Sequence, residues 1–346
     1  MNEKKVLVTG GCGFIGSELV FQLASAGYHV VVLDNFATGK IENLKGLPEK
    51  RFTLVEGDVR DSSLLAKILP SVSKVFHLAC LGIRHSIEAP EETHDVDATG
   101  TLRLLEAARR ARMERFIYVS SSEVYGTAIR VPIDESHPTF PTTPYGASKL
   151  AAEAYARAFF RSYGLPVAIV RPFNAYGPRS HHEGDSGEVI PRFLLRLLAN
   201  RPLMIFGDGE QTRDFTFVED TARAILLAAQ NEDAVGRTLN IGSGKEISIN
   251  ELALILAEVV GVSSPVVVHD EPRPGDIHRL LASYESAREL LGFTPQIKLR
   301  EGLKRLFTWY RGLGVSPQKL LEDEVLYNWR QAFAIGPIHA HAVPHL

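Results

Sequence analysis

The sequence contains a glycine-rich turn, Gly10-Gly11-Cys12-Gly13-Phe14-Ile15-Gly16, between an apolar run and a segment of helical periodicity. The run at residues 5–9 is mostly aliphatic, which is typical of a buried parallel strand. Residues 14–26 carry apolar side chains at helical spacing and stop near Gly27, which predicts a helix. A turn of this kind lets the backbone approach a pyrophosphate, while the helix N-terminus offers N–H groups and a partial positive charge. We therefore predict a dinucleotide-binding turn.

The residue at the end of the next strand indicates which dinucleotide binds. Residues 29–33 form a second apolar run that ends at Asp34. This position is about twenty residues past the glycines, where a carboxylate accepts hydrogen bonds from the adenosine ribose. The same carboxylate would repel a 2′-phosphate, which normally needs a nearby arginine. Because residues 35–40 contain one lysine and no arginine, the sequence favours NAD over NADP.

Strands and helices alternate in the pattern of the first half of the chain. The predicted strands are at 52–56, 74–78, 116–120 and 166–171, and the predicted helices are at 61–69, 93–112 and 145–163. This alternation predicts an α/β fold, a Rossmann-type doubly wound parallel sheet with helices on both faces. The pattern changes after Pro172, where we expect a smaller C-terminal substrate-binding α/β domain.

The predicted domain boundaries follow this change of pattern. Residues 1–172 are assigned to an NAD-binding Rossmann domain, with a return segment at about 220–245. Residues 173–219 and 246–335 are assigned to the substrate domain. The tail at 336–346 has no packing pattern and is predicted to be disordered. It carries three spaced histidines, but we predict no native metal site.

Composition and charge argue against several classes of partner. The 346 residues are 45% apolar and 23% charged, with a formal net charge of −3, so neither a nucleic acid nor an anionic membrane is expected. The two cysteines, Cys12 and Cys80, offer no disulfide framework and are expected to be reduced. The first predicted strand begins too early for a signal peptide, and no uncharged apolar run reaches membrane-spanning length. We expect a cytoplasmic protein.

A tyrosine and a lysine near the start of one predicted helix suggest proton-transfer chemistry. Tyr145 and Lys149 are four residues apart, so their side chains share one face of the helix. A nearby ammonium favours the phenolate and lowers the pKa of a tyrosine, which then exchanges protons with a sugar or alcohol hydroxyl near neutral pH. Residues 120–123, Ser-Ser-Ser-Glu, follow directly on a predicted strand, where a hydroxyl could form a relay with Tyr145.

Six motifs occur in the order found in a known family. They are Thr9-Gly10-Gly11-Cys12-Gly13-Phe14-Ile15-Gly16, Gly57-Asp58-Val59-Arg60-Asp61, His77-Leu78-Ala79, Ser120-Ser121-Ser122-Glu123-Val124-Tyr125-Gly126, Tyr145-Gly146-Ala147-Ser148-Lys149 and Arg171-Pro172-Phe173-Asn174-Ala175-Tyr176-Gly177-Pro178. Over residues 4–311 the chain resembles the extended short-chain dehydrogenase/reductases, and more narrowly the NAD-dependent nucleotide-sugar epimerase/dehydratase family. The resemblance implies a retained NAD, a nucleotide-sugar substrate and a homodimer that pairs through the helices at 93–112 and 145–163.

The resemblance also implies roles for individual residues. Ser121, Tyr145 and Lys149 match the family's catalytic hydroxyl residue, its acid/base and the partner lysine, and Glu123 is a further catalytic candidate. The expected cofactor contacts, besides Tyr145 and Lys149, are Gly10, Gly13, Phe14, Ile15, Gly16, Asp34, Asn35, Asp58, Val59, Leu78, Ala79 and Cys80. The candidate substrate contacts are Arg84, Ser122, Asn174, Val189, Arg213 and Arg273. For the arginines, a salt bridge is the alternative.

A few positions bear on the reaction. In the family, the matching tyrosine removes the proton of the sugar O4 while hydride leaves C4, and subfamilies differ in the fate of the 4-keto sugar. Glu123 resembles the glutamate of decarboxylases and GDP-mannose dehydratases, whereas simple epimerases more often have a small or apolar residue there. Ser122 replaces the acid of dTDP-glucose dehydratases, and the stretch at 273–276 is closer to epimerases. Arg84 could meet a uronate carboxylate.

Together these features lead to one prediction and two alternatives. We predict an NAD-dependent nucleotide-sugar 4-epimerase that acts through a transient 4-keto sugar on a UDP-hexose or a UDP-uronate. The first alternative is a UDP-glucuronate decarboxylase or a hexose 4,6-dehydratase that uses Glu123. The distant alternative, a non-catalytic NAD-binding regulator, is disfavoured because Ser121, Tyr145 and Lys149 are all present.

Overall fold

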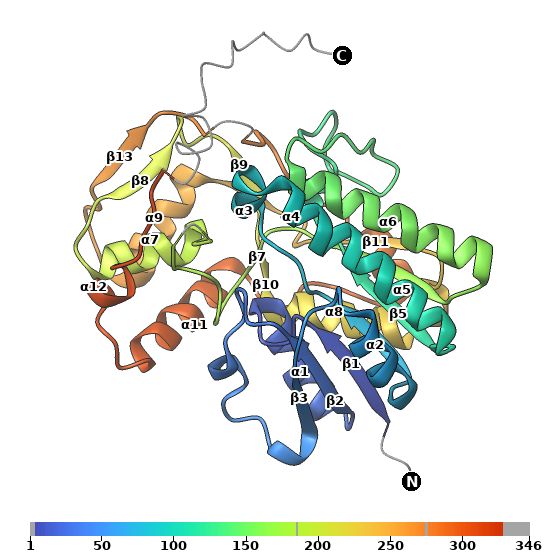
Figure 1. Ribbon diagram of the computed structural model, residues 1–346. Helices are drawn as coiled ribbons and strands as arrows, with labels where there is room; N and C mark the ends of the chain where they lie inside the picture. The colour runs from blue at the N-terminus through green and yellow to red at the C-terminus, as the bar shows by residue number, and fades with distance from the viewer. Residues whose placement is uncertain (1–3, 185, 274–275, 328–346) are drawn as a thin grey trace.

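A seven-stranded parallel sheet forms the centre of the protein (Figure 1), which a computed structural model describes over residues 4–184, 186–273 and 276–327. The order is β11-β6-β5-β4-β1-β2-β3, and all neighbouring strands are parallel. The strands are β1 (Lys5–Thr9), β2 (His29–Asp34), β3 (Phe52–Glu56), β4 (Lys74–His77), β5 (Arg115–Val119), β6 (Val167–Pro172) and β11 (Thr238–Ile241). The predicted α/β class and doubly wound sheet are confirmed. Strand order reverses between β1 and β4, and ligands of such sheets bind at the carboxyl ends beside this reversal.

Helices cover both faces of the sheet, which explains why its strands are apolar at successive positions. In β1, Val6 and Val8 pack into one core, whereas Leu7 packs into the other. The first core is covered by α1 (Phe14–Ser25) and α8 (Val218–Gln230). The second is covered by α2 (Ser62–Ile68), α5 (Thr101–Arg110) and α6 (Pro144–Tyr163).

The helix predicted over 93–112 differs in the structure. It is divided into α4 (Pro90–His94), a π-helical turn at Asp95–Gly100 and α5, and it is preceded by an unpredicted short helix, α3 (Ile83–Glu88). Within the π-helical turn, the Asp97 carboxylate accepts a hydrogen bond from the Leu81 N–H at 2.9 Å. Apolar spacing does not reveal such a turn, because one inserted residue barely changes a helical pattern.

The second domain has its own apolar core beside the carboxyl ends of the sheet (Figure 1). Its helices are α7 (Val189–Leu198), α9 (Ile249–Val260), α11 (Leu299–Gly312) and α12 (Pro317–Leu320). Its short strand pairs are β7 (Ala175–Tyr176) with β10 (Thr216–Phe217), β8 (Leu203–Phe206) with β13 (Val267–Asp270), and β9 (Thr212–Asp214) with β12 (Glu246–Ser248).

One segment assigned to the substrate domain packs elsewhere. The helix α10 (Glu285–Leu291) places Ala287 and Leu291 in the first core of the Rossmann domain, together with Phe293. The assignment of all of 246–335 to the substrate domain is therefore wrong for this helix, because its apolar side chains are buried against β11 and α8. The tail at 336–346 lies outside the described residues. Across the part of the chain that the structure describes, no helix has the length and apolar character needed to cross a membrane.

Candidate active site

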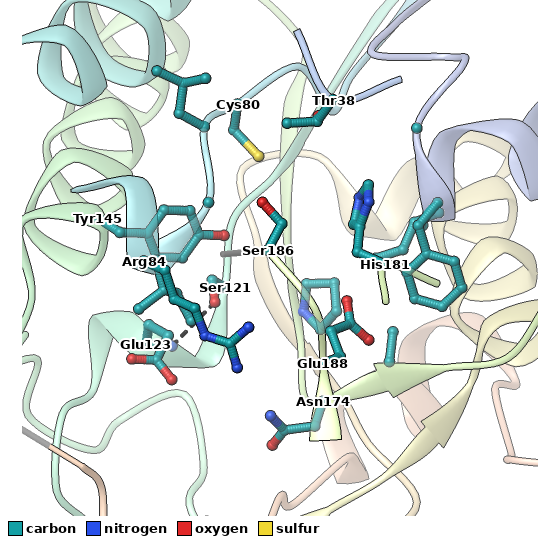
Figure 2. A pocket seen from close by; sticks show the side chains of 18 of the residues that line it. Thr38, Cys80, Arg84, Ser121, Glu123, Tyr145, Asn174, His181, Ser186 and Glu188 are labelled. Atoms are coloured by element: carbon teal, nitrogen blue, oxygen red, sulfur yellow. Dashed lines mark hydrogen bonds between the residues drawn. The ribbon is translucent and has the colours of Figure 1, made fainter. Parts of the chain in front are cut away.

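The sequence-predicted site residues gather around one cavity of about 540 Å³, at the carboxyl ends of the sheet strands and against the second domain. All twenty-two of them line it. Figure 2 shows Tyr145, Arg84, Ser121 and Glu123 on one wall of this cavity, opposite Glu188. The structure thus brings together every candidate residue, while the role of each remains a prediction.

The glycine turn packs against its surroundings with little space for side chains. Gly10 has a φ of +67°, and an added Cβ there would lie 2.8 Å from the Ala79 nitrogen. A Cβ on Gly16 would lie 2.0 Å from the Gly10 carbonyl oxygen, so the first turn of α1 needs glycine to approach the turn before it. The N–H groups of Phe14, Ile15 and Gly16 belong to this first helical turn, where backbone donors have no acceptor within the helix. The turn therefore suits a bound pyrophosphate.

Asp34 is buried at the end of β2, beside this turn. One carboxylate oxygen accepts a hydrogen bond from the Cys12 N–H at 2.8 Å, and the other accepts one from the Phe36 N–H at 2.9 Å. Since a carboxylate has about four acceptor positions, it can still accept bonds from ribose hydroxyls. No arginine occurs in the loop at 35–40 that follows. The buried carboxylate and the loop without arginine therefore fit NAD better than NADP.

Asn35 and Asp58 form the neighbouring wall of the cavity. The Asn35 side-chain amide donates a hydrogen bond to Asp58 at 3.1 Å. The Arg60 guanidinium, hydrogen-bonded to the same carboxylate, lowers the pKa of Asp58 to about 2. Asp58 is therefore ionised and held in place across the physiological pH range.

Tyr145 and Lys149 project from the first turns of α6 into the cavity. The Lys149 Nζ lies 5.7 Å from the centre of the Tyr145 ring and donates a hydrogen bond to the Val119 carbonyl at 3.1 Å. The expected lowering of the tyrosine pKa is not found: burial raises the pKa of Tyr145 well above 10, and the nearby Cys80 and Asp97 add to the effect. Burial therefore decides the direction of this pKa shift, which sequence spacing alone could not show.

Ser121 and Glu123 follow β5 in the loop below Tyr145 (Figure 2). The Ser121 side chain is hydrogen-bonded to Tyr145, and its Oγ accepts the Glu123 N–H at 3.2 Å. Burial raises the pKa of Glu123 to about 7, although the charge of Arg213 opposes this rise. A carboxyl with such a pKa can give or take a proton near neutral pH.

The opposite wall contributes a residue that the sequence did not single out. Glu188 lies directly before α7, and burial raises its pKa to about 8 while the nearby Arg84 charge opposes the rise. Arg84 also donates a hydrogen bond to the Gly187 carbonyl. The sequence analysis named the next residue, Val189, but not Glu188, because a single glutamate before a helix forms no recognisable motif. Arg84 and Glu188 therefore lie near each other at the cavity wall.

The remaining candidates line the cavity beside the second domain. The Arg213 guanidinium donates a hydrogen bond to the Asp276 carboxylate at 2.6 Å, and the Arg273 guanidinium lies 5.2 Å from the centre of the Phe206 ring. The Asn174 side-chain oxygen is buried and has no hydrogen-bond partner within the described ranges. An unsatisfied buried polar atom of this kind is suited to a ligand.

A parallel sheet with this turn, and with a tyrosine–lysine pair at its carboxyl edge, defines a dinucleotide-dependent protein of the short-chain dehydrogenase/reductase class. The family model described as GDP-mannose 4,6 dehydratase matches residues 7–306. The chain belongs to this family of nucleotide-sugar epimerases and dehydratases.

Relatives that catalyse different reactions match the chain about equally well. A UDP-glucose 4-epimerase from Mycolicibacterium smegmatis is 38% identical, covering 89% of this chain and 98% of its own. UDP-glucuronic acid decarboxylase 1 from Arabidopsis thaliana is 36% identical, covering 89% and 70%. The crystal structure of a dTDP-glucose 4,6-dehydratase from Streptomyces venezuelae, with NAD bound, superposes with a TM-score of 0.85 at 35% identity, covering 89% and 97%. These similarities establish the family, and the site has to distinguish among the reactions.

Proposed function

We propose that the protein is an NAD-dependent nucleotide-sugar 4-epimerase that acts on a UDP-hexose or a UDP-uronate. The observation that carries this proposal is the set formed by Ser121, Tyr145 and Lys149 on one cavity wall, next to Ser122. This set can move one proton to and from a sugar hydroxyl. A dehydratase of the dTDP-glucose type needs an acid beside this set, at the position where this chain has the hydroxyl of Ser122.

The cofactor of this chain is NAD. The glycine turn would hold its pyrophosphate, Asp34 its adenosine ribose, and Lys149 the ribose next to the nicotinamide. When bound, NAD supplies a hydride acceptor and donor for the sugar C4. This assignment rests on the close backbone packing of the glycine turn and on a buried ribose-side carboxylate with no arginine in the loop that follows.

The side chains of the protein supply the proton transfer. Burial raises the pKa of Tyr145, so the Lys149 ammonium and the positive nicotinamide of bound NAD would have to favour the phenolate. In that state Tyr145 takes the proton of the sugar O4 as the 4-keto sugar forms and returns it after the keto sugar has presented its other face. Ser121, hydrogen-bonded to Tyr145, keeps the phenol oxygen and the sugar hydroxyl in one relay. Lys149 is the cation placed to stabilise the phenolate, and its bond to the Val119 carbonyl sets its position.

A second candidate function is supported by Glu123 and Arg84. Glu123 has a pKa of about 7 at the cavity wall, which suits a group that removes or adds a proton at C5 of the sugar. Arg84 offers a cation for a uronate carboxylate at the same end of the cavity. A UDP-glucuronate decarboxylase or a 4,6-dehydratase would use these two residues.

The mass of the product distinguishes the two functions. We would incubate the purified protein with UDP-glucose, UDP-N-acetylglucosamine and UDP-glucuronate, and analyse the products by mass spectrometry and NMR. An epimer of unchanged mass is expected, and Glu123→Gln should leave its formation within about threefold of wild type. Loss of water or carbon dioxide, abolished by Glu123→Gln, would replace the epimerase with the second candidate.

We also propose a cytoplasmic homodimer. The helices α5 and α6 pack against each other, and α6 exposes 42% of Tyr155 and 59% of Tyr163. Tyrosines are enriched in protein interfaces relative to the rest of the surface. These exposed rings support pairing through α5 and α6.

A further inference from the structure

A short C-terminal segment adds residues to the cavity beyond the residues that the family model matches. Glu324 and Leu326 line the cavity, whereas the family match ends at residue 306. The segment is attached to the second domain by its backbone, since the Val325 N–H donates to the Gly184 carbonyl at 3.3 Å. The Tyr327 hydroxyl also donates a hydrogen bond to the Asp270 carboxylate at the end of β13. The wall that this segment completes therefore has a defined structure.

Glu324 forms a buried ion pair at this wall. Its Oε2 accepts a hydrogen bond from the Arg196 Nη1 at 2.6 Å, and the two side chains are only 6% and 9% exposed. Arg196 is held in turn from a second side, because its Nε donates to the Pro202 carbonyl at 2.5 Å. The carboxylate is thus fixed in orientation by an arginine that is itself fixed.

The second oxygen of this carboxylate is left without a donor. Glu324 Oε1 is buried, and among the residues that the structure describes it has no hydrogen-bond partner. A buried acceptor without a donor destabilises a folded protein, and more so when it belongs to a charged group. In native proteins such an atom calls for an explanation, such as a functional role or a bound partner that supplies the missing donor.

The neighbours of Glu324 indicate which part of a nucleotide sugar lies there. Met204 and Phe206 of β8, and Ile249 at the start of α9, also line the cavity, and the centre of the Phe206 ring lies 5.8 Å from that of Tyr327 in the same C-terminal segment. They offer flat and apolar surface suited to a nucleobase. Arg213 and Arg273, the cations available to a diphosphate, line the cavity as well. The glycine turn and Tyr145 belong to the other domain.

We propose that Glu324 is a base-recognition residue, whose Oε1 accepts the imide N3–H of uracil. The proposal rests on the proposed function, which places a UDP-sugar in this cavity, and deepens it by assigning the base subsite. A carboxylate cannot pair with the N3 of cytosine, which carries no hydrogen and is itself an acceptor. Glu324 therefore favours UDP-sugars over CDP-sugars, with Arg196 as its positioning residue.

The test measures binding rather than turnover. Dissociation constants for UDP and for N3-methyl-UDP would be determined by calorimetry on the NAD-loaded protein. The wild type should bind UDP at least tenfold more tightly, because the methyl group removes the donor. In Glu324→Ala this ratio should fall below about threefold, and Glu324→Gln should restore part of it, because its amide oxygen can accept the same bond. The control Glu322→Ala changes an exposed carboxylate of the same segment and should keep the wild-type ratio.

Each other outcome overturns a specific statement. Equal binding of the two nucleotides by the wild type, or an unchanged ratio in Glu324→Ala, would overturn the role of Glu324 even if UDP-sugars are epimerised. If the variants do not fold, equal binding of the two nucleotides by the wild type still overturns the proposal. The expected ratios together with no turnover of any UDP-sugar would overturn the proposed function alone. Absence of UDP binding would overturn both.

Discussion

Replacing Glu123 by glutamine should make the stability of the protein less dependent on pH. Burial raises the pKa of this carboxyl from 4.5 to about 7. The unfolded chain releases the proton near pH 4.5, whereas the folded protein keeps it to about pH 7. Between these values the folded state binds more protons, so the free energy of unfolding falls as the pH rises. Since one pKa unit corresponds to about 1.4 kcal/mol, the total loss is about 3 kcal/mol by about pH 8.

Urea unfolding of the wild type and of Glu123→Gln at a series of pH values measures this loss. Glutamine has a similar shape and no proton to lose. The free energies of unfolding of the two proteins should therefore agree within about 0.5 kcal/mol at about pH 4.5. At about pH 8, the free energy of unfolding of the variant should be higher by about 3 kcal/mol. Glu49→Gln, at an exposed carboxylate, controls for removal of a charge. If the free energy of unfolding depends on pH in the same way in the wild type and in Glu123→Gln, the assignment of a buried, proton-holding carboxyl is refuted.

Two other predictions concern catalysis and assembly. Tyr145→Phe should lower kcat by at least ~10²-fold with little change in NAD content, because it removes only the acid/base hydroxyl. Steady-state kinetics measure kcat, and the absorbance of the released cofactor measures the NAD content. Near-native turnover of the variant would contradict the mechanism. Tyr163→Asp should shift the mass in light scattering from dimer to monomer, because it places a charge in the proposed apolar contact of α6. The control Val266→Asp, at an apolar side chain that is 62% exposed and lies outside that helix, should leave the mass unchanged.

Most of the sheet could be predicted from the sequence because its strands are buried on both faces. In a chain with this alternation, a continuous apolar run that is bounded by turn residues forms a buried strand, and the strand at Lys5–Thr9 was located to the residue. The π-helical turn at Asp95–Gly100 could not be predicted, because it depends on how one carboxylate meets the Leu81 backbone. The packing of α10 on the Rossmann domain was missed because amphipathic spacing shows that a helix is buried, but not against which core.

The same distinction applies to the site. Tyr145 and Lys149 could be found in the sequence because they belong to one helix, where a fixed spacing along the chain places two side chains on the same face. Glu188 and Glu324 could not, because they come from loops that reach the cavity only through tertiary packing. The pKa of Tyr145 shows a further limit, since its direction depends on burial that a pair of residues four apart does not specify.

Three glutamates show how the surroundings of a carboxyl group decide the direction of its pKa shift. Glu153 is fully buried, yet its pKa is lowered, because Arg171 donates two hydrogen bonds to it at 2.8 and 2.6 Å. Glu123 and Glu188 lie on the cavity wall, and their pKa values are raised because the nearby arginines do not offset burial. Because Glu123 and Glu188 line the cavity, a ligand there can supply the hydrogen-bond donors that Arg171 supplies to Glu153.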